Sequence, residues 1–299
     1  AVRLPSMPPH RLALAIAVGC LAVVTGLGTC ALASEGSAGG VSELAVTSLG
    51  LEIFLALAAL AGGLLSRRSL AVRLGLGPAR ISGACLALLV LGTLGVSHGL
   101  DGLLELSGLR ERSALVDFDA ALAGAGGKAF WLALLGIGLA PGVGEELLCR
   151  GLVQKGIEPA LGPGRAVVVA ALVFGMLHGD PSHGASAAIL GLYLGTVVVL
   201  SGSVRAAILC HAVNNLVAVT TAAHLPEVHT PGLASALAGL AVAAGCLWAV
   251  QRRRGGGTRG AEGPLGTAPG GRTPAAGEPP PSAARRTIGL QPKPGSDDP

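Results

Sequence analysis

The sequence predicts an all-α fold, a polytopic bundle of transmembrane helices, and three observations carry this prediction. Apolar residues make up 51% of the chain and charged residues only 13%, which is outside the usual balance of a soluble domain. Eight apolar runs approach the length of about 20 helical residues that crosses a hydrocarbon core of about 30 Å. Basic residues collect in every second connecting segment. The partner of most of the surface is therefore expected to be the lipid bilayer.

The expected spans cover residues 11–33, 43–65, 81–100, 128–150, 165–181, 184–201, 204–223 and 231–250. The first has a second interpretation, because an apolar run that ends at Ala31-Leu32-Ala33 is also typical of a cleaved signal peptide, which would leave seven spans. The fifth and sixth runs are short. The mixed segment from Asp101 to Gly127 is predicted to hold a short helix at the membrane interface.

Three regions follow from this pattern. Residues 1–127 hold the first three helices and the mixed loop, residues 128–250 hold helices four to eight with the polar motifs, and residues 251–299 form a tail. Gly and Pro supply 20 of the 49 tail residues, so the tail is expected to be disordered. The formal charge of +4 comes from the tail alone, and no nucleic-acid partner is expected.

The basic segments also predict how the chain is oriented. They include Arg67 and Arg68 after the second run, Lys155 after the fourth and Arg253 after the eighth. The positive-inside rule places such segments in the cytoplasm. We therefore expect a multi-pass protein of the cell membrane with both termini cytoplasmic, and a site that opens toward the cytoplasm.

The first polar motif is Glu145-Glu146-x-x-x-Arg150, inside the fourth run. Ionisable groups at that depth cost about 2.5–3.5 kcal/mol each on insertion scales, so they rarely occur without a partner or a task. On an α-helix Glu146 and Arg150 form an i, i+4 pair, while Glu145 points about 100° away. The preceding Pro141-Gly142-Val143-Gly144 is expected to bend the helix or admit a neighbouring backbone. Glu146 and Arg150 thus support the site, and Glu145 is left for chemistry.

Two further motifs have the same i, i+4 spacing, Phe174-x-x-x-His178 and His211-x-x-x-Asn215. If they converge with Glu145, Glu145 and His178 could hold a water that attacks a carbonyl carbon. His211 and Asn215 could donate hydrogen bonds to the resulting oxyanion. Phe174 is expected to orient His178 by packing. Four other histidines are expected to be structural or solvated, namely His98, His183, His224 and His229.

The order of these three motifs resembles the CPBP family of intramembrane proteases, which includes the CAAX proteases of prenylated proteins and bacteriocin-related, Abi-like members. The resemblance covers about residues 128–223 and has no departure at the motif positions. It implies an α-helical intramembrane endopeptidase for protein or peptide substrates. It also implies that Glu145 and His178 activate water while His211 and Asn215 form an oxyanion hole.

Two alternatives to a metal-free protease remain. The family is often termed a metalloprotease, and Glu145, His178 and His211 could form a three-ligand zinc site with an open position. No His-Glu-x-x-His helix supports zinc, and the sequence modestly favours catalysis without a tightly held metal. The second alternative is a non-catalytic membrane immunity or scaffold protein that binds a partner through the same pocket. A transporter is disfavoured, because only one half has a Gly/Pro break.

Depth along the helices poses a difficulty for convergence. Glu145 and His211 lie toward the basic ends of their runs, while His178 lies about 20 Å along the fifth run from that side. The three meet if the fourth helix continues past Arg150 to Val153 or Lys155, or if the fifth helix starts deep or tilts. The sequence does not choose between these arrangements.

Overall fold

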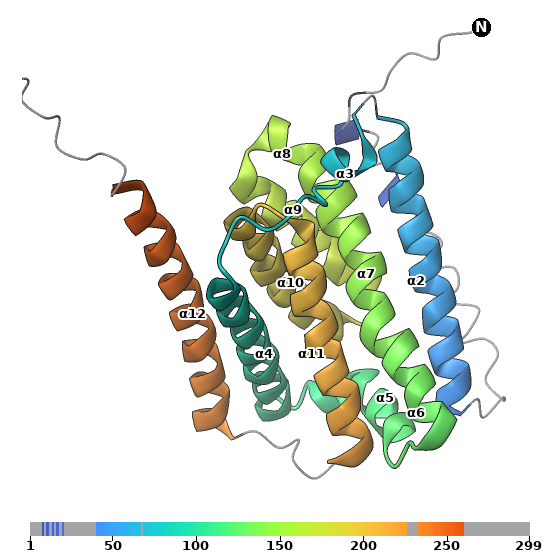
Figure 1. Cartoon of the computed structure of the whole chain (residues 1–299). Coiled ribbons are helices and arrows are strands. Elements are labelled where there is room, and N and C mark those ends of the chain that lie inside the picture. The colour runs from blue at the N-terminus through green and yellow to red at the C-terminus, as the bar shows by residue number, and fades with distance from the viewer. Residues whose placement is uncertain are drawn as a thin grey trace, which may run out of the picture.

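The computed structural model describes residues 40–66, 68–225 and 232–259, together with residues 8, 10, 11, 14, 16, 17 and 20. All regular structure in these ranges is helical (Figure 1), which confirms the predicted fold class. Six helices are long and apolar enough to cross a membrane, namely α2 (Val41–Leu64), α4 (Gly83–Leu106), a continuous helix Gly127–Leu161, α10 (Pro181–Ser201), α11 (Val204–His224) and α12 (Leu233–Arg259). The chain is a multi-pass membrane protein.

The other predicted spans have two different outcomes. The fifth is α9 (Pro163–Leu177), an apolar helix too short to cross the bilayer at right angles. The first predicted span, with its signal-peptide alternative, lies largely outside the described residues. Helix α12 ends at Arg259, nine residues past the predicted end at Val250, and the rest of the predicted tail lies outside the described residues.

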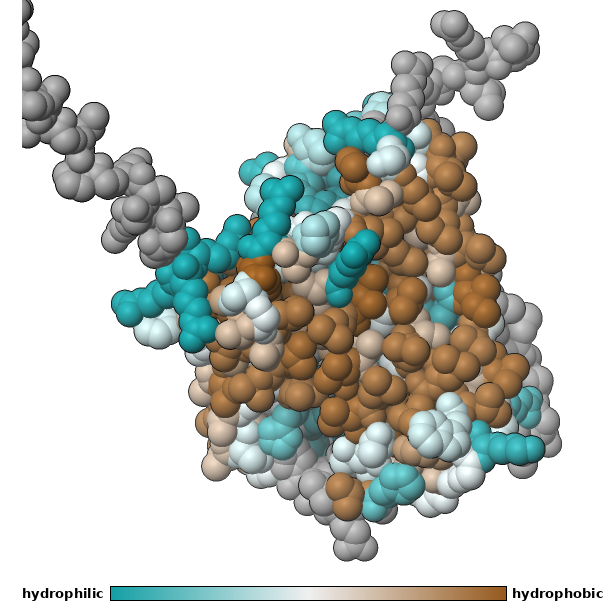
Figure 2. Space-filling model, in the orientation of Figure 1, coloured by the Kyte–Doolittle hydropathy of each residue, from teal (hydrophilic) through white to brown (hydrophobic). Residues whose placement is uncertain are grey.

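Short helices mark the two ends of the bundle (Figure 1). Helix α3 (Leu70–Arg73) lies at one end, which we call the basic end because it carries most of the Lys and Arg side chains. The 3-10 helix η1 (Arg110–Arg112) and α5 (Leu115–Leu122) lie at the opposite end, which we call the α5 end. Helix α5 is the short helix predicted in the mixed segment. Figure 2 shows apolar side chains over most of the middle of one face.

The long helix Gly127–Leu161 consists of α6 (Gly127–Ala133), the π-helix η2 (Leu134–Leu139), α7 (Ala140–Glu146), the π-helix η3 (Leu147–Gln154) and α8 (Lys155–Leu161). It continues eleven residues past the predicted end at Arg150. Gly162 then takes a φ of 78° and reverses the chain into α9, as glycine does without steric cost. Glu145 therefore lies near the middle of the long helix instead of near its end. This removes the expected difference in depth between Glu145 and His178.

Two glycines bring the neighbouring helices close to α7. A Cβ atom on Gly142 would lie 2.7 Å from the backbone nitrogen of Ala212 in α11. A Cβ atom on Gly144 would lie 2.5 Å from the backbone oxygen of Glu52 in α2. Both distances are too short for a real Cβ, so only glycine permits these backbone contacts. The close approach predicted for the Pro141–Gly144 stretch is present, and it holds α7 between α2 and α11.

We expect Gly142→Ala to destabilise the protein by about 1–3 kcal/mol, the usual cost of forcing extra atoms into a packed interior. The added Cβ meets backbone atoms of Ala212, which cannot rotate away. Gly245→Ala in α12 is the matched control, because no atom lies within 4 Å of its Cβ position, and alanine favours a helix by up to about 1 kcal/mol. Thermal melting of both variants in detergent checks this. Equal melting temperatures for the two variants would contradict the packing argument.

Candidate active site

An ion pair at the centre of the bundle anchors the site. Arg150 Nη1 donates to Glu146 Oε1 at 2.5 Å, and both side chains have no exposed surface. Arg150 also donates from Nη2 to the Gly191 carbonyl oxygen of α10 at 3.1 Å and lies 4.3 Å from the centroid of the Phe174 ring. The predicted pairing of Glu146 with Arg150 is therefore present. A buried carboxylate without this partner would carry a large desolvation cost.

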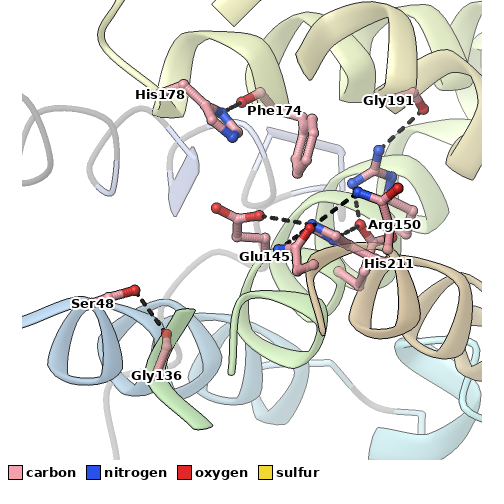
Figure 3. Close-up of polar contacts among 11 residues, drawn as sticks. Ser48, Gly136, Glu145, Arg150, Phe174, His178, Gly191 and His211 are labelled. Carbon is pink, nitrogen blue, oxygen red and sulfur yellow. Dashed lines mark hydrogen bonds and ion pairs between the residues drawn. The ribbon is translucent and has the colours of Figure 1, made fainter. Parts of the chain in front are cut away.

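Glu146 also contacts His211, which the sequence did not predict. The Nδ1 atom of His211 lies 3.0 Å from Glu146 Oε1, so this one oxygen contacts both the guanidinium and the imidazole. The Nε2 atom of His211 lies 3.2 Å from Asn215 Nδ2 and 3.7 Å from Glu145 Oε2, and Figure 3 shows Glu145 beside His211. With Nδ1–H donating to Glu146, a neutral His211 would accept from Asn215 at Nε2. Glu146 thus orients His211 as well as pairing with Arg150.

His178 lies at the end of α9, where the chain leaves the helix. Its Nδ1 is 2.9 Å from the Phe174 carbonyl oxygen, to which Nδ1–H can donate, and this leaves Nε2 for a water or substrate. The Phe174 ring makes edge contacts with both imidazoles, at centroid distances of 5.0 Å to His178 and 5.5 Å to His211. Phe174 therefore packs against His178 and also against His211.

The four predicted catalytic residues line one cavity of about 390 Å³. Glu145 and His211 lie within ion-pair distance of each other, and Asn215 bonds to His211. No hydrogen bond or ion pair joins His178 to Glu145 in the described part of the chain, so these two residues face the cavity without direct contact. The side chain of Glu145 is 12% exposed, and the cavity is large enough for several waters or a short peptide segment beside it.

Two residues of the site were missed by sequence reasoning. Glu52 of α2 lines the cavity, is only 4% exposed, and its Oε2 has no hydrogen-bond partner among the residues that the structure describes. The available signal was a single carboxylate in the middle of an apolar span. His183, expected to be structural, also lines the cavity, and its ring lies 4.4 Å from that of His178.

We expect Glu52→Gln to lower turnover while it leaves the protein folded, because the amide keeps the shape but removes a carboxylate that faces the cavity beside Glu145. Removing an unpartnered buried carboxylate should also leave the melting temperature unchanged or raise it, since such a group costs about 1–3 kcal/mol or more. Glu43→Gln is the control, an exposed glutamate in the first turn of the same helix. A Glu52→Gln variant that melts well below wild type would show that the carboxylate is needed for folding instead.

A polar strap closes part of the α5 end of the cavity. Arg110 forms ion pairs with Asp101 and Asp119 and lies 3.7 Å from Glu105. Asp180 accepts from the backbone N–H of His183 at 2.6 Å, from Ser113 Oγ at 3.1 Å and from the backbone N–H of Ala114 at 3.3 Å. Burial acts to raise the pKa of Asp180, but these hydrogen bonds outweigh it and lower that pKa below its usual range. The contacts fix η1 and α5 against the start of α10.

The arrangement does not fit the zinc alternative. Among the residues that the structure describes, no three His, Cys, Asp or Glu side chains are grouped as metal ligands. Both ring nitrogens of His211 already contact protein groups, and Phe174 lies between His211 and His178. No step of the mechanism below is therefore assigned to a metal.

Comparison with known families agrees with the three motifs. Residues 127–217 match the family described as Type II CAAX prenyl endopeptidase Rce1-like. No curated protein and no solved structure gives a significant match to the chain. The matched segment begins with α6 and ends in α11 just after Asn215, so it contains every predicted site residue, whereas Glu52 lies outside it. The match over this segment supports assignment of the chain to the CPBP/CAAX protease family.

Proposed function

We propose that the protein is an intramembrane endopeptidase that cleaves peptide bonds of membrane-associated proteins with a water activated by Glu145 and His178. The observation that carries the proposal is the shared cavity, which Glu145, His178, His211 and Asn215 all line. The family match over residues 127–217 supports a protease. The positioning contacts behind these groups support catalysis over passive binding.

The proposed reaction gives each group a separate role. Glu145 takes a proton from a water while His178 Nε2 holds that water, and the water oxygen bonds to the carbonyl carbon of the scissile peptide. The carbonyl oxygen becomes an oxyanion that accepts hydrogen bonds from Asn215 Nδ2 and His211 Nε2. The C–N bond then breaks, and the proton on Glu145 passes to the leaving nitrogen. The products are a carboxylic acid and an amine.

The role of His211 depends on its protonation. Its Nδ1 contacts Glu146, so its Nε2 can donate to an oxyanion only when the ring carries both protons. Each ring nitrogen has a carboxylate beside it, because Glu146 Oε1 lies 3.0 Å from Nδ1 and Glu145 Oε2 lies 3.7 Å from Nε2. Arg150 pairs with the first of these carboxylates. Glu146 is thus proposed as a positioning residue for His211.

The alternative function is a non-catalytic immunity or scaffold protein that binds a partner in the same cavity. The two functions differ in one assay, peptide cleavage by the purified full chain in detergent. Cleavage that is lost in Glu145→Gln supports the protease. Biological activity that survives in Glu145→Gln supports the scaffold. A prenylated CAAX-type protein is one proposed substrate class, which rests on the family description alone.

A further inference from the structure

Glu52 is a carboxyl group of the cavity that the proposed reaction leaves unused. It lies in the middle of α2, is 4% exposed, and lines the same cavity as Glu145 and His178. Its Oε2 has no hydrogen-bond partner in the ranges that the structure describes. A buried carboxylate without a cation or a full set of hydrogen bonds is costly, so such a group tends to keep its proton. Glu52 can therefore hold a proton inside the cavity.

The packing of α2 against the long helix places Glu52 next to Glu145 (Figure 1). Ser48 Oγ of α2 donates to the Gly136 carbonyl oxygen at 2.8 Å, a contact shown in Figure 3. One turn further along α2, Glu52 lies against Gly144, where a Cβ atom would be 2.5 Å from both the backbone oxygen and Oε2 of Glu52. Gly144 directly precedes Glu145. The Glu52 carboxyl group thus lies against the turn of α7 that carries Glu145.

The guanidinium groups in and beside the cavity already pair with other acids. Arg110 pairs with acids of the polar strap, and Arg150 pairs with Glu146. Glu52 forms no ion pair within the described ranges. The other titratable groups that line the cavity are Asp101, Arg110, Asp119, His178, His183 and His211. Two neighbouring carboxyl groups of which neither pairs with a guanidinium are costly to ionise together, and such a pair holds one proton at neutral pH.

We propose that Glu52 is a further catalytic residue, which holds a proton beside the Glu145 carboxylate and gives it to the leaving nitrogen. This rests on the proposed protease function and assigns the group that protonates the leaving nitrogen. Glu145 takes a proton from water as the water oxygen bonds to the carbonyl carbon. Glu52 gives its proton to the peptide nitrogen as the C–N bond breaks, and the proton on Glu145 then passes to Glu52. The proton from water thereby reaches the leaving nitrogen by way of Glu52, and both carboxyl groups return to their starting states.

Infrared spectroscopy of the purified full chain in detergent tests the proton on Glu52 without any need for catalysis. A carboxylic acid and a carboxylate absorb at separate frequencies, and exposed Asp and Glu side chains are carboxylates at neutral pH. The wild-type spectrum minus that of Glu52→Gln should therefore contain a carboxylic-acid band. Glu43→Gln, at an exposed position of the same helix, should remove only a carboxylate band. Loss of a carboxylate band in Glu52→Gln would overturn the proposal. A wild type without any acid band would do so even if Glu52→Gln does not fold.

Two substrates that differ in one group test the proton transfer. One is a quenched fluorescent peptide that ends in a prenylated CAAX sequence, and the other has an ester oxygen in place of the scissile N–H. An amide nitrogen must be protonated before it leaves, whereas an ester oxygen needs this much less. Glu52→Gln should lower turnover of the peptide by about 10²–10⁴, the usual contribution of acid–base catalysis, and turnover of the ester by less than about tenfold. Glu145→Gln should lower both rates, because both reactions need an activated water.

Equal losses on the two substrates in Glu52→Gln would overturn the assignment, because Glu52 would then act on the attack of water and not on the leaving group. Peptide cleavage by Glu52→Gln at the wild-type rate would remove Glu52 from the reaction. In both cases wild type is active and Glu145→Gln is not. Failure of the protease proposal gives a different pattern, in which wild type cleaves neither substrate or Glu145→Gln cleaves both at the wild-type rate.

Discussion

Glu145→Gln is expected to lower the rate of peptide cleavage by about two orders of magnitude or more, the usual contribution of a general base. Glutamine has the same shape but cannot take a proton from water. Among the described residues Glu145 forms an ion pair only with His211, whose Nε2 lies 3.7 Å from Glu145 Oε2, whereas Glu146 pairs with Arg150. The loss should therefore appear in turnover, with an unchanged melting temperature.

The comparison with Glu146→Gln separates chemistry from architecture. That variant weakens a fully buried ion pair and a contact to His211, so both melting temperature and turnover should fall. Glu43→Gln makes the same chemical change at an exposed position of α2 and should behave as wild type. Turnover, melting temperature and expression are measured on all three purified proteins. Cleavage by Glu145→Gln at the wild-type rate would remove Glu145 from the mechanism.

The apolar runs were sufficient to predict the helices, because lipid leaves few other structures for a span of about 20 apolar residues. They placed the end of the fourth helix wrongly. The expected span ended at Arg150, yet Arg150 and Gln154 donate to the carbonyl oxygens of Gly191 and Gly195 in α10. A buried polar side chain is tolerated when it is hydrogen-bonded, and partners 41 residues away along the chain cannot be seen in a run of local sequence.

The sequence predicted those contacts of the site that join residues four positions apart on one helix. The i, i+4 pairs Glu146–Arg150 and His211–Asn215 are both in contact. Contacts between helices were not predictable in this way. The bond from Glu146 to His211 and the position of Glu52 both depend on how α2, α7 and α11 pack. Gly142 and Gly144 gave the only local signal of that packing, as sites of close approach.

The second large effect is expected at the oxyanion hole. His211→Ala and Asn215→Ala should each lower turnover by about 10²–10³, the size expected for loss of one oxyanion donor. A chelator should leave the wild-type rate unchanged, because the mechanism uses no metal. His211→Ala also removes a partner of Glu146, so it should melt lower than Asn215→Ala, whose amide is only partly buried.

Metal analysis of the purified, active protein distinguishes this mechanism from the zinc alternative. If the chain holds about one zinc, loses activity in chelator, recovers it when zinc is restored, and loses the metal in His211→Ala, then His211 is a ligand and not an oxyanion donor. The Asn215→Ala variant tests the oxyanion hole independently of the metal analysis. A carboxamide that donates to an oxyanion should be needed for turnover whether or not the protein holds a metal. An Asn215→Ala variant with wild-type turnover would remove the proposed oxyanion hole, since His211 Nε2 would then have to stabilise the charge alone.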